Sequence, residues 1–548
     1  MTVRTVHTAS RHLAAPELPG MHPVRAATGL TVRLAARGTL ILAGLLALYS
    51  VLEIVSYNAT YADASSRAAL QMFDTPAIRM LQGPPHGIDT AGGFTAWDDG
   101  WVMGAVTAIW AMLTSTRFLR GEEDDDRVAP LLAAALPARV LAAVQLAVLG
   151  AAALLFAGSV TLAMGLSGED WTGDALFGLA IGGFAALWAA TGAVCAQVLD
   201  TRRRALSAAA ALFGAAYVLR LVANSTEDRG WLRRLTPWGW LDEVEPFAAR
   251  RGWAVAAFWV AALLLAVLAV ALRGRRDTGG AFVTLADRRA PRLRWLGGPA
   301  RFAWHESRGV LAAWVVGLAV WAGVIGAMTG TMLDFLAADE SYRRMLDALG
   351  MSMMLRAEGF IGVLAGVFGV CFALYAVWRV AAARTDEATG RLDSILVLPV
   401  TRRRWLTGHV LLALAGAGVL AVVCAATTWV GTRQSGAGLH LDAALRAMLN
   451  QLPVAVLFVG FATLVLGVAP RLTQVLPASL AGLAYVVELV GPGLDWPAWV
   501  LDLSPFHHLA LVPAEPFALV PALVLTGLGL VAATVGVEAF GRRDLAAA

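Results

Sequence analysis

Two short charged segments contain the residues whose types and spacing best suit them to bind another molecule. Each places acidic residues ahead of an apolar stretch that ends near a proline. Acidic side chains favour a helix N-terminus, so each segment predicts a short helix on a membrane surface with one face free for a partner. Either acidic run alone could be a solvated loop. The occurrence of a similar run in both halves of the chain favours a partner-binding segment instead. The segments contain Glu122, Glu123, Asp124, Arg127 and Pro137, and Asp386, Glu387, Gly390, Arg391, Asp393, Pro399 and Arg402.

The sequence lacks the patterns expected of a hydrolase or a metal enzyme. A phosphate-binding loop needs a lysine that reaches the β- and γ-phosphates, and the 548 residues include no lysine. The H-E-x-x-H and G-x-S-x-G patterns are also absent. The adjacent pair His507 and His508 would point to different faces of a helix, which makes a poor zinc site. We therefore predict that the chain is no enzyme and holds no cofactor or metal.

Apolar runs separate and flank the two charged segments. Hydrophobic residues make up 58% of the chain and charged residues only 15%, against roughly 25% charged in soluble domains. Runs long enough to cross ~30 Å of hydrocarbon predict an all-α polytopic membrane protein with about twelve helices. The predicted spans are 39–57, 100–119, 139–165, 174–199, 205–223, 253–272, 310–332, 359–381, 406–430, 447–469, 475–490 and 516–540.

The arginines predict how these helices are oriented. Cytoplasmic connections carry an excess of basic residues, and alternate connections here carry clusters of arginine. Both termini are then cytoplasmic, in a multi-pass protein of the plasma membrane. The connection at 224–252 is an exception, because it carries five arginines and is still expected outside. Five acidic residues in the same connection offset these arginines. The inner clusters are Arg202 to Arg204, Arg273 to Arg276, Arg402 to Arg404, and Arg542 with Arg543.

An internal repeat divides the helices into two parallel sets of six. The segment Leu235 to Leu241 resembles Leu503 to Leu509, and Arg275-Arg276-Asp277 resembles Arg542-Arg543-Asp544. These pairs, with Gly93-Phe94 and Gly359-Phe360, are offset by 266 to 268 positions. An even number of helices per repeat gives both halves the same orientation.

The repeat sets the predicted domain boundaries. Two basic, partly apolar stretches precede the first helix of each half and predict interfacial elbow helices; in the second, Arg301, His305 and Arg308 share one helical face. The predicted parts are a cytoplasmic N-terminus with an elbow helix (1–38), a first six-helix half (39–272), a linker with the second elbow helix (273–309), a second half (310–540) and a cytoplasmic tail (541–548).

The second charged segment, with the repeat, resembles a known family. Its residues from Glu387 to Arg402 look like the coupling-helix segment of ABC-2 type permeases, and the whole chain resembles the fused two-half permeases of actinobacterial polyketide-antibiotic and multidrug exporters. The resemblance implies an exporter of hydrophobic or amphipathic compounds. It also implies a separate ATPase, present as a homodimer that binds ATP and Mg²⁺ and receives both charged segments. The clustering of arginine in short connections predicts membrane topology rather than a nucleic-acid partner, and the substrate-binding residues are unknown.

Two other functions are compatible with these features. An ion-coupled secondary carrier could also be built from two parallel six-helix halves, although such carriers usually need a buried carboxylate near the membrane midplane. The chain shows no convincing candidate for that carboxylate. The second alternative is a non-transporting membrane scaffold or a bilayer-embedded enzyme.

The first charged segment departs from the family pattern. Asp126 stands where the second segment has Gly390, and Ala129-Pro130 stands where it has Asp393-Ser394. We therefore predict that the second segment couples more strongly. Glu387→Ala should reduce transport-linked ATPase activity more than Glu123→Ala, and equal losses in the two variants would contradict this.

Overall fold

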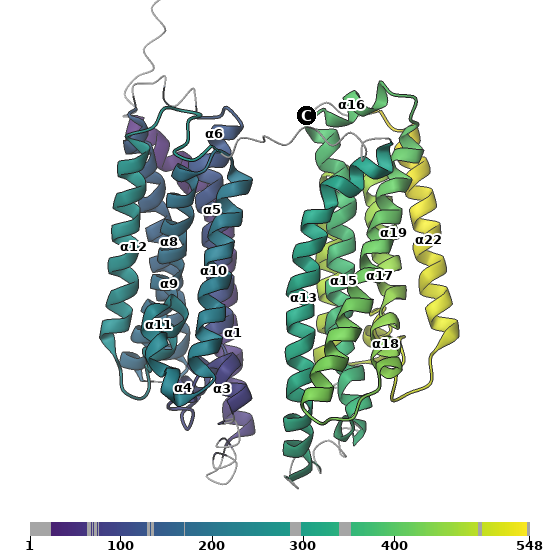
Figure 1. Ribbon diagram of the computed structural model, residues 1–548, viewed down its shortest axis with the longest axis horizontal. Helices are drawn as coiled ribbons and strands as arrows, with labels where there is room; N and C mark the ends of the chain where they lie inside the picture. The colour runs from purple at the N-terminus through teal and green to yellow at the C-terminus, as the bar shows by residue number, and fades with distance from the viewer. Residues whose placement is uncertain are drawn as a thin grey trace, which may run out of the picture. The chain divides into compact units, whose positions relative to one another are not determined.

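The computed structural model describes residues 23–62, 67, 70, 74, 76–128, 132, 136–168, 170–284, 298–338, 343, 352–491 and 496–544. The chain divides into two units, Met1–Asp287 and Arg288–Ala548, called here the first and second halves. Both are helical bundles (Figure 1). In the part of the chain that is described, the only β-type pairing is an isolated bridge between Leu199 and Val283.

Among its described residues, the first half contains six long helices joined by short ones. The long helices are α1 (Pro23–Thr60), α5 (Gly100–Thr116), α8 (Ala138–Leu166), α9 (Trp171–Val198), α10 (Arg202–Asn224) and α12 (Gly252–Arg273). The short elements are α3 (Pro76–Gln82), α4 (Ala91–Asp98), a π-helix (Arg117–Gly121), α6 (Glu122–Asp124), a 3₁₀-helix (Glu227–Leu235) and α11 (Pro237–Glu243).

The second half has the same order of long helices. They are α13 (Pro299–Ala338), α15 (Ala357–Ala388), α17 (Arg402–Gln434), α18 (Leu441–Leu449) followed by α19 (Leu452–Val468), α20 (Val475–Val490) and α22 (Leu519–Arg542). Shorter elements are 3₁₀-helices at Ser352–Leu355 and Pro470–Leu472, α16 (Arg391–Leu396) and α21 (Ala498–Leu501).

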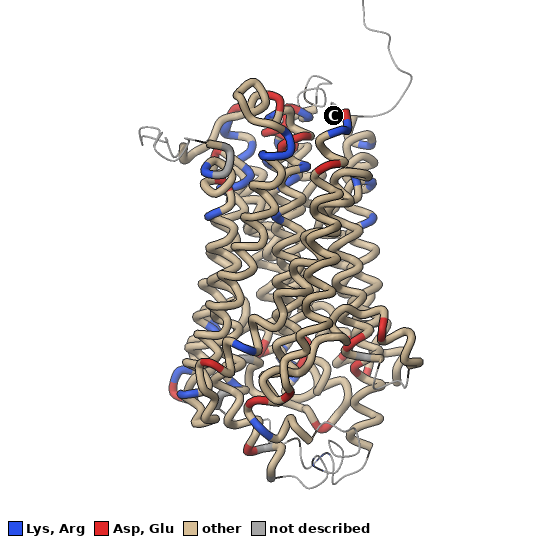
Figure 2. The backbone as a smooth tube through the Cα atoms, turned by 90° about the vertical axis from the view of Figure 1, so that its right-hand side faces the viewer, with Lys and Arg blue, Asp and Glu red and all other residues tan. Residues whose placement is uncertain are grey.

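The predicted all-α polytopic architecture is confirmed. Eleven helices in the described ranges are long and apolar enough to cross a membrane, and the charged residues gather toward the helix ends (Figure 2). The twelfth predicted span is α20. Its 16 residues rise only about 24 Å, which is less than the ~30 Å hydrocarbon thickness.

Neither predicted elbow segment is a separate element, and the domain boundaries at 38 and 309 stay predictions. The first elbow segment runs without a break into α1, and the second runs into α13. The residue between each elbow and its span is a glycine, Gly38 or Gly309, and neither junction contains a proline. A single glycine costs only ~1 kcal/mol in a helix, so neither chain segment ends there. Residues 1–22, 285–297 and 545–548, which hold parts of the predicted N-terminus, linker and tail, lie outside the described residues.

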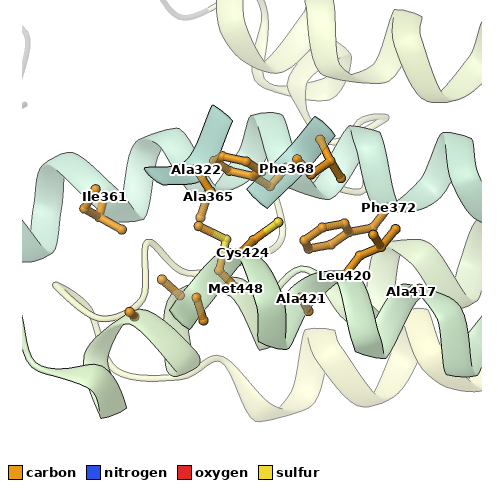
Figure 3. Packing of buried hydrophobic residues seen from close by; sticks show 14 of the residues in the cluster. Ala322, Ile361, Ala365, Phe368, Phe372, Ala417, Leu420, Ala421, Cys424 and Met448 are labelled. Atoms are coloured by element: carbon orange, nitrogen blue, oxygen red, sulfur yellow. The ribbon is translucent and has the colours of Figure 1, made fainter. Parts of the chain in front are cut away.

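Tight packing of aromatic and small side chains holds the second half together. Phe368 and Phe372 of α15 meet Leu420 and Cys424 of α17 and Met448 of α18 in one buried cluster (Figure 3). On another face of this half, a Cβ added at a glycine of α19 or α22 would meet the backbone of the other helix. Small residues permit this close approach of helices in a membrane. The glycines are Gly460, Gly467, Gly529 and Gly536.

Ion pairs form around the arginine-rich connection 224–252 of the first half. Arg220, which is buried at the end of α10, donates two hydrogen bonds to the carboxylate of Asp242 at 2.9 and 2.7 Å. Arg251 pairs with Glu243 and Glu245. Arg233 also pairs with Glu243, and Arg250 with Asp170, so three of the five arginines of 224–252 have acidic partners.

Candidate functional site

The second charged segment lies at the end of its half where the arginines cluster. We call the helix ends at 117–139, 198–204, 273–284, 384–404 and 538–544 the arginine-rich ends. α15 stops at Ala388, and Gly390 then adopts φ +69°, a left-handed conformation that glycine enters without a Cβ penalty. The chain turns there into α16. Pro399 prevents α16 from continuing, and Thr401 caps α17 through a hydrogen bond from the Arg404 N–H at 3.3 Å.

A buried ion pair anchors this segment to the last helix of the half. The Arg543 guanidinium donates to the carboxylate of Glu387 at 2.9 Å, and the Glu387 side chain is almost fully buried. Arg402 donates to the carbonyl oxygen of Arg543 at 2.7 Å. The end of α15, the start of α17 and the residue after α22 are therefore tied together at one point.

A second ion-pair group links α16 to the first helix of the half. Arg391, the first residue of α16, pairs with Glu306 of α13 at 2.6 Å and with Asp386 at 3.4 Å. Arg379, one of the largest fully buried side chains, donates to the carbonyl oxygen of Ala303 at 3.3 Å. The segment is thus held from both sides, by α13 and by α22.

The tip of the segment is apolar and faces away from the bundle. Asp393 is exposed, as are Val397 and Leu398 at the end of α16, which are 86% and 59% exposed. The two apolar side chains lie within a turn of Pro399 and Arg402. A charged base beneath an apolar tip is suited to insert into a groove of a protein partner.

The first charged segment repeats the anchor. Glu123 accepts two hydrogen bonds from Arg276, at 2.9 and 2.5 Å, and one from the Gly279 N–H at 2.5 Å. Both side chains are buried. Arg276 follows α12 as Arg543 follows α22, so the ion pairs Glu123–Arg276 and Glu387–Arg543 occupy equivalent positions in the two halves. We call them the Glu–Arg anchors.

Arg120 adds further bonds in the first half. Its buried guanidinium donates to the carbonyl oxygens of Gly280 at 2.8 Å and of Asp200, and to the Asp124 carboxylate at 3.0 Å. The other oxygen of Asp124 accepts the Arg202 N–H at 2.7 Å. A hydrogen bond from Arg204 lowers the pKa of Asp200, which keeps that loop carboxylate charged. The segment is thereby fixed to the α9–α10 connection.

The difference at Asp126 does not change the backbone. Asp126 has φ +56° and Gly390 has φ +69°, so both turn the chain through the same left-handed region. Aspartate is among the few residues that tolerate this conformation. The sequence departure noted above is therefore not a departure in local geometry at this position.

The predicted contact residues divide into buried anchors and exposed groups. Glu123, Asp386 and Glu387 are buried, and Glu122 is partly buried beside Arg117 and Arg127. Arg402 is also partly buried, and the exposed members are Asp124, Arg127, Pro137, Gly390, Arg391, Asp393 and Pro399. Residues 129–131 and 133–135, in the apolar part of the first segment, lie outside the described residues.

Sequence reasoning missed the partners of the buried acids. Arg276 and Arg543 served only as repeat and orientation markers, although each lies in the same Gly-Arg-Arg-Asp run after the last helix of its half. That repeated run was the available signal. Within the described ranges, no cluster of three or more His, Cys, Asp or Glu residues could hold a metal ion.

Together, the fold and the paired segments define a multi-pass membrane protein of two similar helical halves. The sequence profile of the family "Multidrug efflux system permease Rv1217c, C-terminal domain" matches residues 24–274 and 296–541. The chain is also 29% identical, over 498 residues, to the multidrug efflux system permease protein Rv1217c of Mycobacterium tuberculosis, a match that covers 90% of this chain and 89% of that protein. The chain belongs to this family of multidrug efflux permeases, in agreement with the resemblance to multidrug exporter permeases.

The Glu–Arg anchor of the first half should contribute strongly to stability. Removing one partner of a buried ion pair typically costs about 3–5 kcal/mol because the other charge stays buried. We expect Glu123→Gln and Arg276→Gln each to lower the unfolding temperature of the purified protein, while the double variant loses less than the sum of the two.

The control is Asp125→Asn, because the Asp125 side chain is 57% exposed and exposed pairs contribute only about 0–1 kcal/mol. Unfolding temperatures would be followed by intrinsic tryptophan fluorescence in detergent. Strict additivity of the two single substitutions would contradict the anchor, since independent sites add and coupled sites do not.

Proposed function

We propose that this chain is the membrane-spanning permease subunit of an ATP-driven ABC exporter of hydrophobic or amphipathic compounds. A separate ATPase, as a homodimer, binds ATP and Mg²⁺ and docks on the two charged segments. The chain itself supplies no ATP-hydrolysing site. Its membership in a family of multidrug efflux permeases supports the transport role.

The observation that carries the proposal is the apolar tip of the second segment. Val397 and Leu398 are the outermost apolar side chains of a turn that ion pairs fix to three helices of its half. A membrane would not cover them if the arginine-rich ends lie in water, and an exposed apolar tip on a rigid base favours a protein partner.

The anchors provide a route for force from the ATPase to the helices. A force on the first segment acts on α5 and α6. It is transmitted through Glu123 to Arg276, which follows α12 in the chain. A force on the second segment acts on α15 and α16. It is transmitted through Glu387 to Arg543, which follows α22 in the chain. Closure of the ATPase dimer would then move the second and sixth helices of each half together.

The orientation follows from the same ends. In each half the arginine clusters lie at one set of helix ends, the arginine-rich ends. Cytoplasmic connections of membrane proteins carry an excess of arginine and lysine. We therefore place these ends, both termini and the docked ATPase in the cytoplasm, with the chain in the plasma membrane. Membrane lipid and a small hydrophobic substrate are the other partners.

Charge placed on the apolar tip should uncouple transport without unfolding the chain. In cells that also produce the ATPase, Val397→Asp with Leu398→Asp should reduce ATP-dependent drug efflux at least tenfold. The reason is that two carboxylates would be buried in the docking contact without partners. Efflux of a fluorescent drug and recovery of the ATPase with the tagged permease are the measurements.

The control is Leu503→Asp, which changes a leucine of the same half that is 72% exposed at the end away from the arginines. It should leave ATPase recovery unchanged. Normal efflux and ATPase recovery in the Val397/Leu398 variant would contradict the proposal, as would efflux that a protonophore abolishes while ATP is maintained.

A further inference from the structure

The first half has an apolar groove that the charged segments do not use. It has a volume of about 480 Å³, within the ~300–1,000 Å³ range of ligand pockets. The walls are α8 and α12 and the floor is α9, with Gly150, Ala186, Ala190, Trp259, Ala262 and Ala266 among its lining residues. A Cβ added at Gly150 would meet no atom within 4 Å, so the groove has open space at this position.

Side-chain size explains why the groove exists in this half. In the second half, Gly460 of α19 lies against Gly529 of α22, so the two backbones touch. Ala190 stands eight residues before the end of α9, as Gly460 does before the end of α19; Ala262 stands twelve residues before Gly274, as Gly529 does before Gly541. The two alanines line the groove, where their methyl groups hold α9 and α12 farther apart than two glycines would.

Two arginines lie one helical turn beyond the groove. Arg139 precedes the lining residue Ala143 by four positions on α8, and a Cβ added at Gly274, four positions after the lining residue Val270, would lie 3.8 Å from the Arg139 Cβ. Arg275 follows Gly274. Both arginines are exposed, and the side chain of neither forms a hydrogen bond or ion pair with any residue in the described ranges.

The equivalent arginines of the second half are neutralised. Arg403, whose side chain contacts the Cβ position of Gly541, pairs with Glu538 at 2.7 Å, and Arg542 pairs with the same carboxylate at 2.7 Å. Three residues before Gly274, where the second half has Glu538, the first half has Ala271. The two positive charges beside the groove of the first half therefore lack the acid that pairs with their equivalents in the second half.

We propose that this groove binds an anionic phospholipid of the surrounding membrane. One acyl chain lies in the groove between α8 and α12, and the phosphate contacts Arg139 and Arg275. Basic pockets between membrane helices at the cytoplasmic side recognise anionic head groups, and the alanine-lined walls match an apolar chain. The lipid supplies the negative charge that Glu538 supplies in the other half.

The test titrates phosphatidylglycerol or phosphatidylethanolamine, with identical acyl chains, onto the delipidated full chain and counts bound lipid by native mass spectrometry. We expect phosphatidylglycerol to bind more tightly than phosphatidylethanolamine. Each of Arg139→Gln and Arg275→Gln should weaken phosphatidylglycerol binding about fivefold, in line with ~1 kcal/mol per basic residue near an anionic surface. Arg403→Gln with Arg542→Gln is the matched control and should leave binding unchanged.

A second variant tests the acyl-chain site. Gly150→Leu fills the groove and should reduce binding of both lipids, whereas Gly418→Leu on α17, where an added Cβ also meets nothing within 4 Å, should not. If Gly150→Leu lowers the yield of folded protein, the arginine variants still decide. Three results would overturn the proposal. The first is equal binding of the two lipids, and the second is phosphatidylglycerol binding that both arginine substitutions leave intact. The third is a Gly150→Leu variant that binds a hydrophobic drug less tightly but binds both lipids as before.

Discussion

The Glu–Arg anchor is the interaction on which each half depends. An acid at the end of the second long helix is buried against an arginine that follows the sixth, as Glu123–Arg276 and as Glu387–Arg543. Charges buried in this way are stable only while both partners remain in place. The anchor therefore holds together the helix ends from which each charged segment projects. It fixes the segment to the last helix of its half.

The two halves share this anchor but differ in what surrounds it. In the first half, Arg120 and Gly279 add bonds around Glu123, so the segment is fixed on several sides. In the second, the anchor has fewer hydrogen bonds, and the Arg391–Glu306 ion pair and the exposed apolar tip are the main features. Within the described residues, the first half therefore has the more extensive attachment of its segment, and the second half shows an accessible apolar tip. The groove and its unpaired arginines extend this difference to the lipid side.

The long helices could be predicted from the sequence because a membrane span needs a long apolar run, and eleven of the twelve predicted spans meet that requirement. The elbow helices could not, since the charge pattern of Arg301, His305 and Arg308 fits either an interfacial helix or the start of a longer one. The charged segments were found from their acidic residues, but burial of Glu123 and Glu387 was not foreseen. The burial of these two acids depends on which distant arginine packs against each of them. This long-range pairing leaves no local pattern in a single sequence. The equivalence of Asp126 and Gly390 was likewise visible only in their backbone angles.

The central claim is that the paired segments receive an ATPase from another chain. Native mass spectrometry of the tagged permease, gently extracted from its own membrane with a non-hydrolysable ATP analogue present, tests this most directly. Two identical ATP-binding chains for each permease chain are the predicted result, because each half offers one anchored segment. A permease that is isolated without any ATP-binding chain, under conditions that keep its drug-efflux activity after reconstitution, would contradict the account.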